Sequence, residues 1–252
     1  MSASLRARMH AGDLLAGTFL KTPAHDLIEV LSLSGLDFLC LDAEHAAFDR
    51  ARTDACLAVA RALGLATLVR VPWGRPEHIQ AALDAGATGI VVPHVTNADT
   101  AGEIARAARF GHGGRGFAGS TRWAGFATAR MPELLARSAE ETVVVAMIEE
   151  PEAVEAADAI AATEGIDALM LGPADLSVAL GKSDQSSPEL AQAYQTVGAA
   201  CTAHGKTFAT WVPDADAALP RHAAGVRMFF AASEHAWMLQ GARAAAAGLK
   251  AL

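Results

Sequence analysis

Short runs of apolar residues recur at intervals along the chain, and several are continuously apolar rather than alternating with polar residues. A continuous apolar run of this length is typical of a strand buried on both of its faces, as in a parallel sheet. The pattern therefore predicts eight strands. They are residues 14–19, 38–43, 67–72, 89–95, 142–149, 168–173, 207–212 and 227–233.

Helix-like stretches lie between these runs, and many end in glycine, which favours a helix C-cap. They are residues 24–34, 52–64, 76–86, 98–110, 151–162, 187–205, 215–225 and 234–252. Strict alternation of strand and helix predicts a parallel sheet. Eight repeats in 252 residues favour a closed (β/α)8 TIM barrel of the α/β class, with a doubly wound open sheet as the alternative. No linker divides the chain, so we expect a single domain over residues 1–252.

The amino-acid composition argues against nucleic-acid binding, a secreted protein and a membrane protein. The chain has 28 acidic and 20 basic residues, a net charge of -8, and only four scattered lysines, so we expect no nucleic-acid partner. Its three cysteines show no metal-binding spacing and fit a reducing compartment. The N-terminus lacks the apolar core of a signal peptide, and no run is long enough to span a bilayer. We expect a soluble, cytoplasmic protein without a membrane partner.

Polar residues concentrate where the predicted strands end. In a barrel of this kind the active site is built at the carboxyl ends of the strands. A cation, several carboxylates and histidines therefore converge on one rim. These residues are Asp42, Glu44, His45, Arg70, His94, Glu149, Glu150 and Asp175.

Glu149 and Asp175 are the best metal ligands in this group. Each lies just past an apolar strand, and the two strands are expected to be neighbours. Two carboxylates without a paired cysteine or histidine suit a hard divalent ion such as Mg²⁺ or Mn²⁺, with water and substrate oxygens completing its coordination. The alternative is that one of them is an acid at a helix N-terminus, favoured there by the helix dipole.

Arg70 and His45 are candidate catalytic residues. Arg70 interrupts an apolar strand, so it either pairs with a buried carboxylate or points at an anionic ligand. His45 follows Glu44 at a strand end and could be a general acid–base near neutral pH. Asp42 and Asp84 are candidates to hold the second ring nitrogen of His45.

A lysine that acts through a Schiff base is not favoured. Such an amine is normally desolvated, which lowers its pKa and makes it nucleophilic. No lysine occurs inside a predicted strand, and Lys21 only follows the first one. A Schiff-base mechanism is therefore not expected.

Several segments together resemble the pyruvate-dependent class II aldolases of the HpcH/HpaI type. They are LDAEHAAFD (41–49), LVRVP (68–72), LDAGATGIVVPHV (83–95), GGRGF (113–117), AMIEEPEAV (146–154) and LGPADLSVALG (171–181). They occur in the family's order between about residues 15 and 235. The resemblance implies an eight-stranded barrel, a divalent metal (Mg²⁺, Mn²⁺ or Co²⁺) and cleavage of a 4-hydroxy-2-oxo acid to pyruvate and an aldehyde through an enolate.

The resemblance also assigns roles to residues. It implies Glu149 and Asp175 as metal ligands, His45 and Arg70 as catalytic residues, and Asp42 and Asp84 as supporting acids. Residues expected to contact the substrate are Arg70, Phe19, Gly172, Pro173, Ala174 and Val212. This chain departs from many members by carrying Met147 in place of glutamine, Ala46 in place of glycine and Phe19 in place of tryptophan.

Two other functions remain open. One is an acyl-CoA lyase of the citrate-lyase-subunit type, for which four arginines in or beside the long irregular stretch 111–131 would bind the CoA phosphates. These are Arg109, Arg115, Arg122 and Arg130. The other is a non-catalytic barrel that binds carboxylates. Release of pyruvate without CoA, sensitive to a chelator, would separate the aldolase from both.

The closing helix-like stretch predicts an oligomer. Trp237, Met238 and Leu239 are consecutive, so they point in different directions around a helix, and the many alanines nearby allow another helix to approach closely. A well-buried final barrel helix is the alternative. The resembling superfamily exchanges terminal helices and forms hexamers, so we expect a homo-oligomer, a hexamer as first choice, in which Asp84 could reach a neighbouring subunit's site.

Overall fold

The computed structural model describes residues 3–252, and its eight parallel strands close into one barrel in chain order, with β8 pairing with β1. Each observed strand overlaps one of the predicted runs. The closure confirms the (β/α)8 barrel and excludes the open sheet. The strands are β1 (Leu15–Leu20), β2 (Phe38–Asp42), β3 (Ala66–Arg70), β4 (Gly89–Val92), β5 (Val143–Ile148), β6 (Ala168–Leu171), β7 (Thr207–Val212) and β8 (Met228–Ser233).

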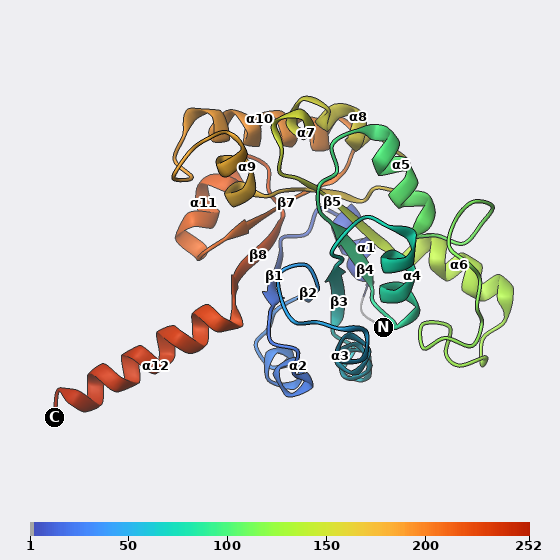
Figure 1. The fold of residues 1–252 in the computed structure, drawn as a ribbon, viewed down its shortest axis with the longest axis horizontal. Coiled ribbons are helices and arrows are strands. Elements are labelled where there is room, and N and C mark those ends of the chain that lie inside the picture. Colours follow the sequence, from blue (N-terminus) through green and yellow to red (C-terminus); the bar gives the residue numbers. More distant parts are fainter. Residues whose placement is uncertain (1–2) are drawn as a thin grey trace.

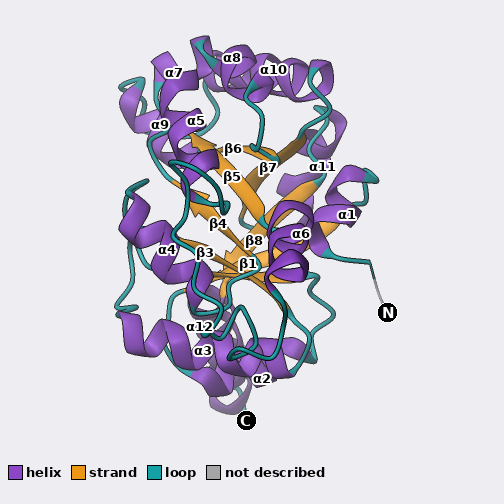
Figure 2. Ribbon diagram, turned by 90° about the vertical axis from the view of Figure 1, so that its right-hand side faces the viewer, coloured by secondary structure: helices purple, strands orange, loops and turns teal. Residues whose placement is uncertain are grey.

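Helices surround the strands on the outside of the barrel, as Figure 2 shows. Helices α1, α6 and α9 lie where we expected none, and the stretch 151–162 is divided into α7 and α8. Within the described residues, no helix has the length and apolar character that a membrane crossing requires. The helices are α1 (Leu5–His10), α2 (His25–Ser32), α3 (Arg50–Ala62), α4 (Pro76–Asp84), α5 (Ala98–Ala107), α6 (Met131–Glu141), α7 (Pro151–Glu155), α8 (Ala157–Ala162), α9 (Pro173–Ala179), α10 (Pro188–Ala203), α11 (Ala215–Ala223) and α12 (Glu234–Lys250).

Strand β5 shows why the strand sequences are continuously apolar. Val143, Val145 and Met147 belong to the cluster inside the barrel, whereas Val144 and Ile148 belong to the cluster between the barrel and the helices. Because successive side chains of a strand point to opposite faces, both faces of β5 are buried. The same alternation decides which side chains at the strand ends point into the barrel mouth.

The long irregular segment between α5 and α6 lies at the amino end of the barrel. Its residue Trp123 lines a cavity together with Ala66 at the start of β3 and Thr88 just before β4. In a (β/α)8 barrel the active site is at the opposite, carboxyl end. This segment therefore does not contribute to a site within its own barrel.

The last helix, α12, leaves the barrel and extends away from it (Figure 1). Glu234, its first residue, is the only one of its residues that is buried. Met238, Leu239 and Leu249 are 60%, 51% and 70% exposed, respectively. The apolar surface predicted for this helix is present, and within one chain it is not covered.

Candidate functional site

Polar side chains from neighbouring strands meet at the carboxyl end of the barrel. Asp42 is the last residue of β2 and Arg70 the last of β3, and the two are register partners. Glu149 follows β5 directly, and Asp175 lies in the first turn of α9 after β6. Because all the strands are parallel, these ends share one rim. The structure thus places these four expected site residues on neighbouring strand ends, at the position expected for an active site.

Arg70 is held by Asp42 through two hydrogen bonds. Its Nε donates to Oδ1 at 3.0 Å and its Nη2 donates to Oδ2 at 2.8 Å. The Arg70 side chain is 8% exposed and that of Asp42 is fully buried. The guanidinium carbon lies 4.5 Å from the centroid of the Phe19 ring. A planar group bound along one edge and stacked on one face has a fixed orientation.

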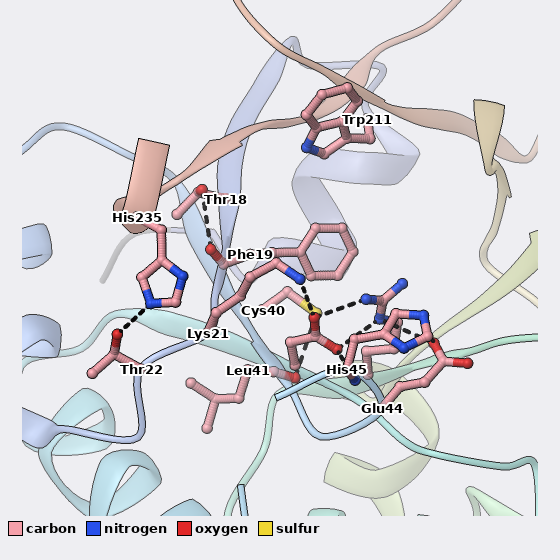
Figure 3. A network of polar contacts seen from close by, with 12 residues as sticks. Thr18, Phe19, Lys21, Thr22, Cys40, Leu41, Glu44, His45, Trp211 and His235 are labelled. Atoms are coloured by element: carbon pink, nitrogen blue, oxygen red, sulfur yellow. Dashed lines mark hydrogen bonds and ion pairs between the residues drawn. The ribbon is translucent and has the colours of Figure 1, made fainter. Parts of the chain in front are cut away.

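Asp42 also accepts two further hydrogen bonds. Lys21 Nζ donates to Oδ2 at 2.8 Å and the backbone N–H of His45 donates to Oδ1 at 3.1 Å (Figure 3). Burial by itself raises the pKa of Asp42, but the hydrogen bonds and charge of Arg70 and the hydrogen bond of Lys21 outweigh burial and lower this pKa to about 2. Asp42 is therefore an anion at neutral pH.

The expectation that Asp42 holds the ring of His45 needs correction. Asp42 binds the backbone of His45, and its two oxygens are shared among Arg70, Lys21 and that N–H. The His45 ring lies beside Glu44 instead, with 3.7 Å between Nε2 and Oε2, and its side chain is 56% exposed. The reason is that the Asp42 side chain points into the barrel, whereas His45 lies three residues further along in the loop.

Glu44 lies between Arg70 at the end of β3 and His94 after β4, and the sequence had suggested no specific role for it. Its carboxylate lies 3.3 Å from Arg70 Nε and 3.7 Å from His94 Nε2. Burial raises the pKa of Glu44, while the charges of Arg70, His45 and His94 oppose that shift. The clue in the sequence was its position between Asp42 and His45 at a strand end.

Glu149 is a buried acid on the side of the site formed by β4, β5 and β6. Its side chain is 3% exposed, and Oε1 accepts the backbone N–H of His94 at 2.8 Å. Burial raises the pKa of Glu149 to about 7; the negative charges of Asp175 and Glu44 add to this shift, and His94 opposes it. A buried carboxylate surrounded by other carboxylates is a site that favours a cation.

His94 and Glu150 stand beside Glu149, and neither was assigned a role from the sequence. His94 Nδ1 lies 2.5 Å from Glu150 Oε1 and 3.3 Å from Glu149 Oε1. One ligand atom from each of these three residues lies within 4.8 Å of the others. His94 has φ 57°, a left-handed conformation that is uncommon for a residue other than glycine. Its position after β4 was the available signal.

The segment Gly172–Pro173–Ala174 turns directly from β6 into α9. Gly172 packs against Glu149: a Cβ atom at Gly172 would lie 3.1 Å from Glu149 Oε2. The N–H of Gly172 donates to the carbonyl oxygen of Ile148 at 3.0 Å, and Pro173 has no N–H. Of these three residues, which were expected to contact the substrate, only Ala174 therefore has a backbone N–H that the start of the helix leaves without an intrahelical partner.

Phe19 and Val212 were both expected to contact the substrate, and the structure separates them. Phe19 lies in the barrel interior under Arg70. Val212 belongs to the cluster between barrel and helices, so its side chain points away from the mouth. Trp211, one residue earlier, packs against the interior cluster. In Figure 3 its ring lies above the polar network. The two-residue alternation of strand side chains explains the correction.

Asp84 does not join the site within its own barrel. Asp84 is the last residue of α4. Because the barrel helices run opposite to the strands, the last residue of α4 lies at the amino end of the barrel. There its carboxylate forms an ion pair with Arg115, and its carbonyl oxygen accepts the N–H of Trp123 at 3.2 Å. The expectation that Asp84 holds the ring of His45 of the same chain is therefore wrong.

The chain is similar to aldolases and to a citrate synthase. The model of the family described as HpcH/HpaI aldolase/citrate lyase matches residues 15–237. A 5-keto-4-deoxy-D-glucarate aldolase of Klebsiella pneumoniae is 38% identical over 192 residues, which cover 75% of this chain and 74% of that protein. A family protein from Burkholderia cenocepacia has a TM-score of 0.92 and 32% identity, covering 98% of each chain. The citrate synthase SbnG has a TM-score of 0.87 and 30% identity, covering 98% of this chain and 97% of its own.

Asp42→Asn should lower the free energy of unfolding by roughly 3 kcal/mol at pH 7, because it removes the bidentate partner of the buried Arg70 and leaves only Glu44, 3.3 Å from Nε, beside it. A carboxyl with a depressed pKa stabilises the fold above its unfolded pKa and loses this contribution as the pH falls through its folded pKa. The difference from wild type should therefore shrink as the pH falls from about 4 towards 2. Denaturant titrations at several pH values measure it.

Asp26→Asn is the matched control, because the Asp26 side chain is 79% exposed. This variant should stay within about 0.5 kcal/mol of wild type at each pH. A difference for Asp42→Asn that did not change with pH would contradict the ion pair as its cause.

Proposed function

Because the chain belongs to the HpcH/HpaI aldolase/citrate lyase family and is a carbon–carbon lyase, we propose that it is a class II aldolase. In this proposal it cleaves a 4-hydroxy-2-oxo acid reversibly to pyruvate, or a close 2-oxo acid, and an aldehyde. The observation that supports it most strongly is Glu149, a buried acid whose neighbours Asp175 and Glu44 are also acidic. Among residues 3–252, no lysine or arginine forms an ion pair with Glu149.

A divalent cation fits this group of carboxylates. Glu149 and Asp175 would hold it, because carboxylate oxygens are the ligands preferred by hard cations such as Mg²⁺ and Mn²⁺ and are also accepted by Co²⁺. His94 and Glu150 are the nearest additional donors. When bound, such a cation supplies a Lewis acid that stabilises negative charge on the keto oxygen of the substrate. Its binding would also remove the cost of ionising Glu149 in a buried position.

Arg70 provides fixed positive charge at the same mouth. Asp42 occupies its Nε and Nη2 groups, and within the described part of the chain Nη1 has no hydrogen-bond partner. The two N–H donors of Nη1 are therefore free to bind the oxyanion of the substrate as negative charge develops. The stack on Phe19 holds them in one direction.

His45 is the residue proposed to move the proton. Its half-exposed ring extends from the loop after β2, beside Glu44 and on the same rim as Arg70. In cleavage the ring would accept the proton of the C4 hydroxyl group, and in synthesis it would remove a proton from C3. Glu44, 3.7 Å away, would stabilise the imidazolium that results.

Lys21 lies at this mouth, but its geometry does not support a Schiff base. Its Nζ donates to Asp42 at 2.8 Å. An ammonium ion paired with a permanent carboxylate is a poor nucleophile, because the lone pair needed for attack is protonated. This supports a metal rather than an iminium as the electron sink.

The alternative of an acyl-CoA lyase loses its main support. Each of the four arginines considered for the CoA phosphates forms an ion pair within the chain. The pairs are Arg109 with Asp167, Arg115 with Asp84, Arg122 with Asp54, and Arg130 with Glu133. A phosphate would have to compete with these carboxylates. The three cysteines are free and buried, which supports the proposal that the enzyme works in the reducing cytoplasm.

Removal of divalent metal should abolish release of pyruvate from a 4-hydroxy-2-oxo acid in the absence of CoA, and added Mn²⁺, Mg²⁺ or Co²⁺ should restore it. Glu149→Gln keeps the shape of the side chain but not its charge. This variant should lose about a hundredfold in turnover and bind Mn²⁺ far more weakly. Enzyme-coupled assays of pyruvate and titration with Mn²⁺ measure the two effects.

Glu152→Gln is the matched control, because Glu152 is exposed in the first turn of α7, close in sequence to Glu149. It should behave as wild type in both measurements. Full activity after exhaustive metal removal, or trapping of pyruvate on Lys21 by borohydride, would refute the class II proposal.

The exposed helix α12 supports a further part of the proposal, a homo-oligomer. Its apolar side chains Met238, Leu239 and Leu249 are more than half exposed in the isolated chain. Burial of such a surface is favourable, at about 25 cal/mol per Å². We propose that α12 packs on, or is exchanged with, a neighbouring subunit in an assembly of closed symmetry, with a hexamer as first choice.

Light scattering should therefore give a mass that is a multiple of the 26.0 kDa chain. Met238→Glu together with Leu239→Glu should reduce that mass, because two charges are placed on the contact surface. Val178→Glu, at another exposed apolar residue outside α12, is the control and should leave the mass unchanged. An active 26.0 kDa monomer at dilute concentration would refute this part of the proposal.

A further inference from the structure

We propose that Lys21 is a specificity-determining residue that binds a second carboxylate of the substrate, so that the preferred aldehyde is itself an anion. The inference rests on the proposed aldolase function, because it concerns the acceptor at that same site. Its starting observation is the juxtaposition of two cations on one carboxylate: Lys21 Nζ and Arg70 Nη2 both donate to Asp42 Oδ2, each at 2.8 Å.

The two cations are therefore close enough to be reached by one small molecule. Lys21 directly follows β1 and Arg70 ends β3, so they lie on either side of Asp42 at the end of β2. Figure 3 shows the Lys21 side chain reaching toward the polar contacts beside Glu44 and His45. A ligand that carries two acidic groups can engage both cations, whereas a neutral aldehyde can engage neither with a charge.

Asp42 does not need the second cation. The bidentate contact with Arg70 already neutralises its single charge and satisfies both of its oxygens. An ammonium has three N–H donors, and among the described residues Lys21 Nζ has a hydrogen bond only to Asp42. The side chain is 32% exposed. The described part of the chain therefore leaves donors of this partly exposed ammonium unused, and a substrate anion at the mouth can accept them.

The backbone under Lys21 is held by a buried carboxylate from another part of the chain. Glu234, 3% exposed, accepts the N–H of Lys21 through both oxygens at 3.0 and 3.1 Å and the N–H of Thr22 at 2.6 Å. His235 Nε2 lies 2.8 Å from the hydroxyl oxygen of Thr22. A buried charge committed to two backbone N–H groups fixes where the Lys21 side chain begins, which reduces the entropy that binding would cost.

A purely structural role would have a different consequence. If Lys21 only helped Asp42 to orient Arg70, its loss would impair every substrate to the same degree, because Arg70 acts on the oxo acid common to all of them. If Lys21 binds a second carboxylate, its loss impairs only substrates that carry one. The comparison of matched charged and neutral substrates therefore separates the two roles.

The kinetic test uses pyruvate with acceptors paired by size: glyoxylate against glycolaldehyde, and succinic semialdehyde against butanal. Lys21→Met should lower kcat/KM by about tenfold to a hundredfold for the charged acceptors and by less than about threefold for the neutral ones. Lys21→Arg should recover most of the preference. Lys182→Met, at a lysine that is 35% exposed and also ion-paired, is the matched control and should not change the ratio.

A second measurement does not depend on turnover. Calorimetric titration of the metal-loaded enzyme should show that Lys21→Met weakens the binding of 2-oxoglutarate, a dianion, by at least about tenfold. The same substitution should weaken the binding of 2-oxobutyrate, a monoanion, by less than about threefold. Equal losses for both ligands, or none for either, would overturn the role of Lys21. If wild type cleaved no carbon–carbon bond and the dianion were still selectively weakened, the aldolase proposal would fail while the role of Lys21 stood.

Discussion

The bidentate ion pair between Asp42 and Arg70 is the contact on which the rest of the site depends. The two residues are register partners at the ends of adjacent strands, so the barrel itself places a carboxylate beside a guanidinium in a region without solvent. Once paired, Asp42 can also accept the Lys21 ammonium and the backbone N–H of His45, which positions the loops after β1 and β2. Breaking this pair would leave a buried charge uncompensated.

The site has one half in which the charges of acidic groups are balanced by cations and another half in which they are not. On the side of β1 to β3, the cations Arg70 and Lys21 face Asp42 and Glu44. On the side of β4 to β6, acidic groups outnumber the available positive charge, so burial and mutual repulsion raise the pKa of Glu149 to about 7. A divalent cation would balance that second half. A 2-oxo acid bridging the halves would then meet a Lewis acid on one side and fixed N–H donors on the other.

The barrel could be predicted from the sequence because most strand residues are buried on both faces, so several of the apolar runs are continuous and easily recognised. Helix α9 was missed because it begins with Pro173 at the very end of a predicted strand run, where no polar spacer separates strand from helix. Glu149, Asp175 and Arg70 were found because they directly follow or end apolar strands. Lys21, Glu44 and His94 were given no role because their contacts lie across strands, between residues far apart in the chain. Val212 was expected to contact the substrate from the resemblance alone, and a run of apolar residues on both faces of β7 does not reveal which face points inward.

The central claim is that these residues generate an enolate from pyruvate, and isotope exchange tests it without knowledge of the aldehyde. Pyruvate incubated with the metal-loaded enzyme in D2O, with no acceptor present, is followed by NMR at C3. The account predicts that deuterium enters C3 and that exchange stops when the metal is removed. It also predicts that His45→Ala and Arg70→Lys slow exchange by about a hundredfold, since one removes the base and the other replaces a planar donor with a point charge. Absence of exchange in the metal-loaded wild type, or unchanged exchange in both variants, would contradict the account.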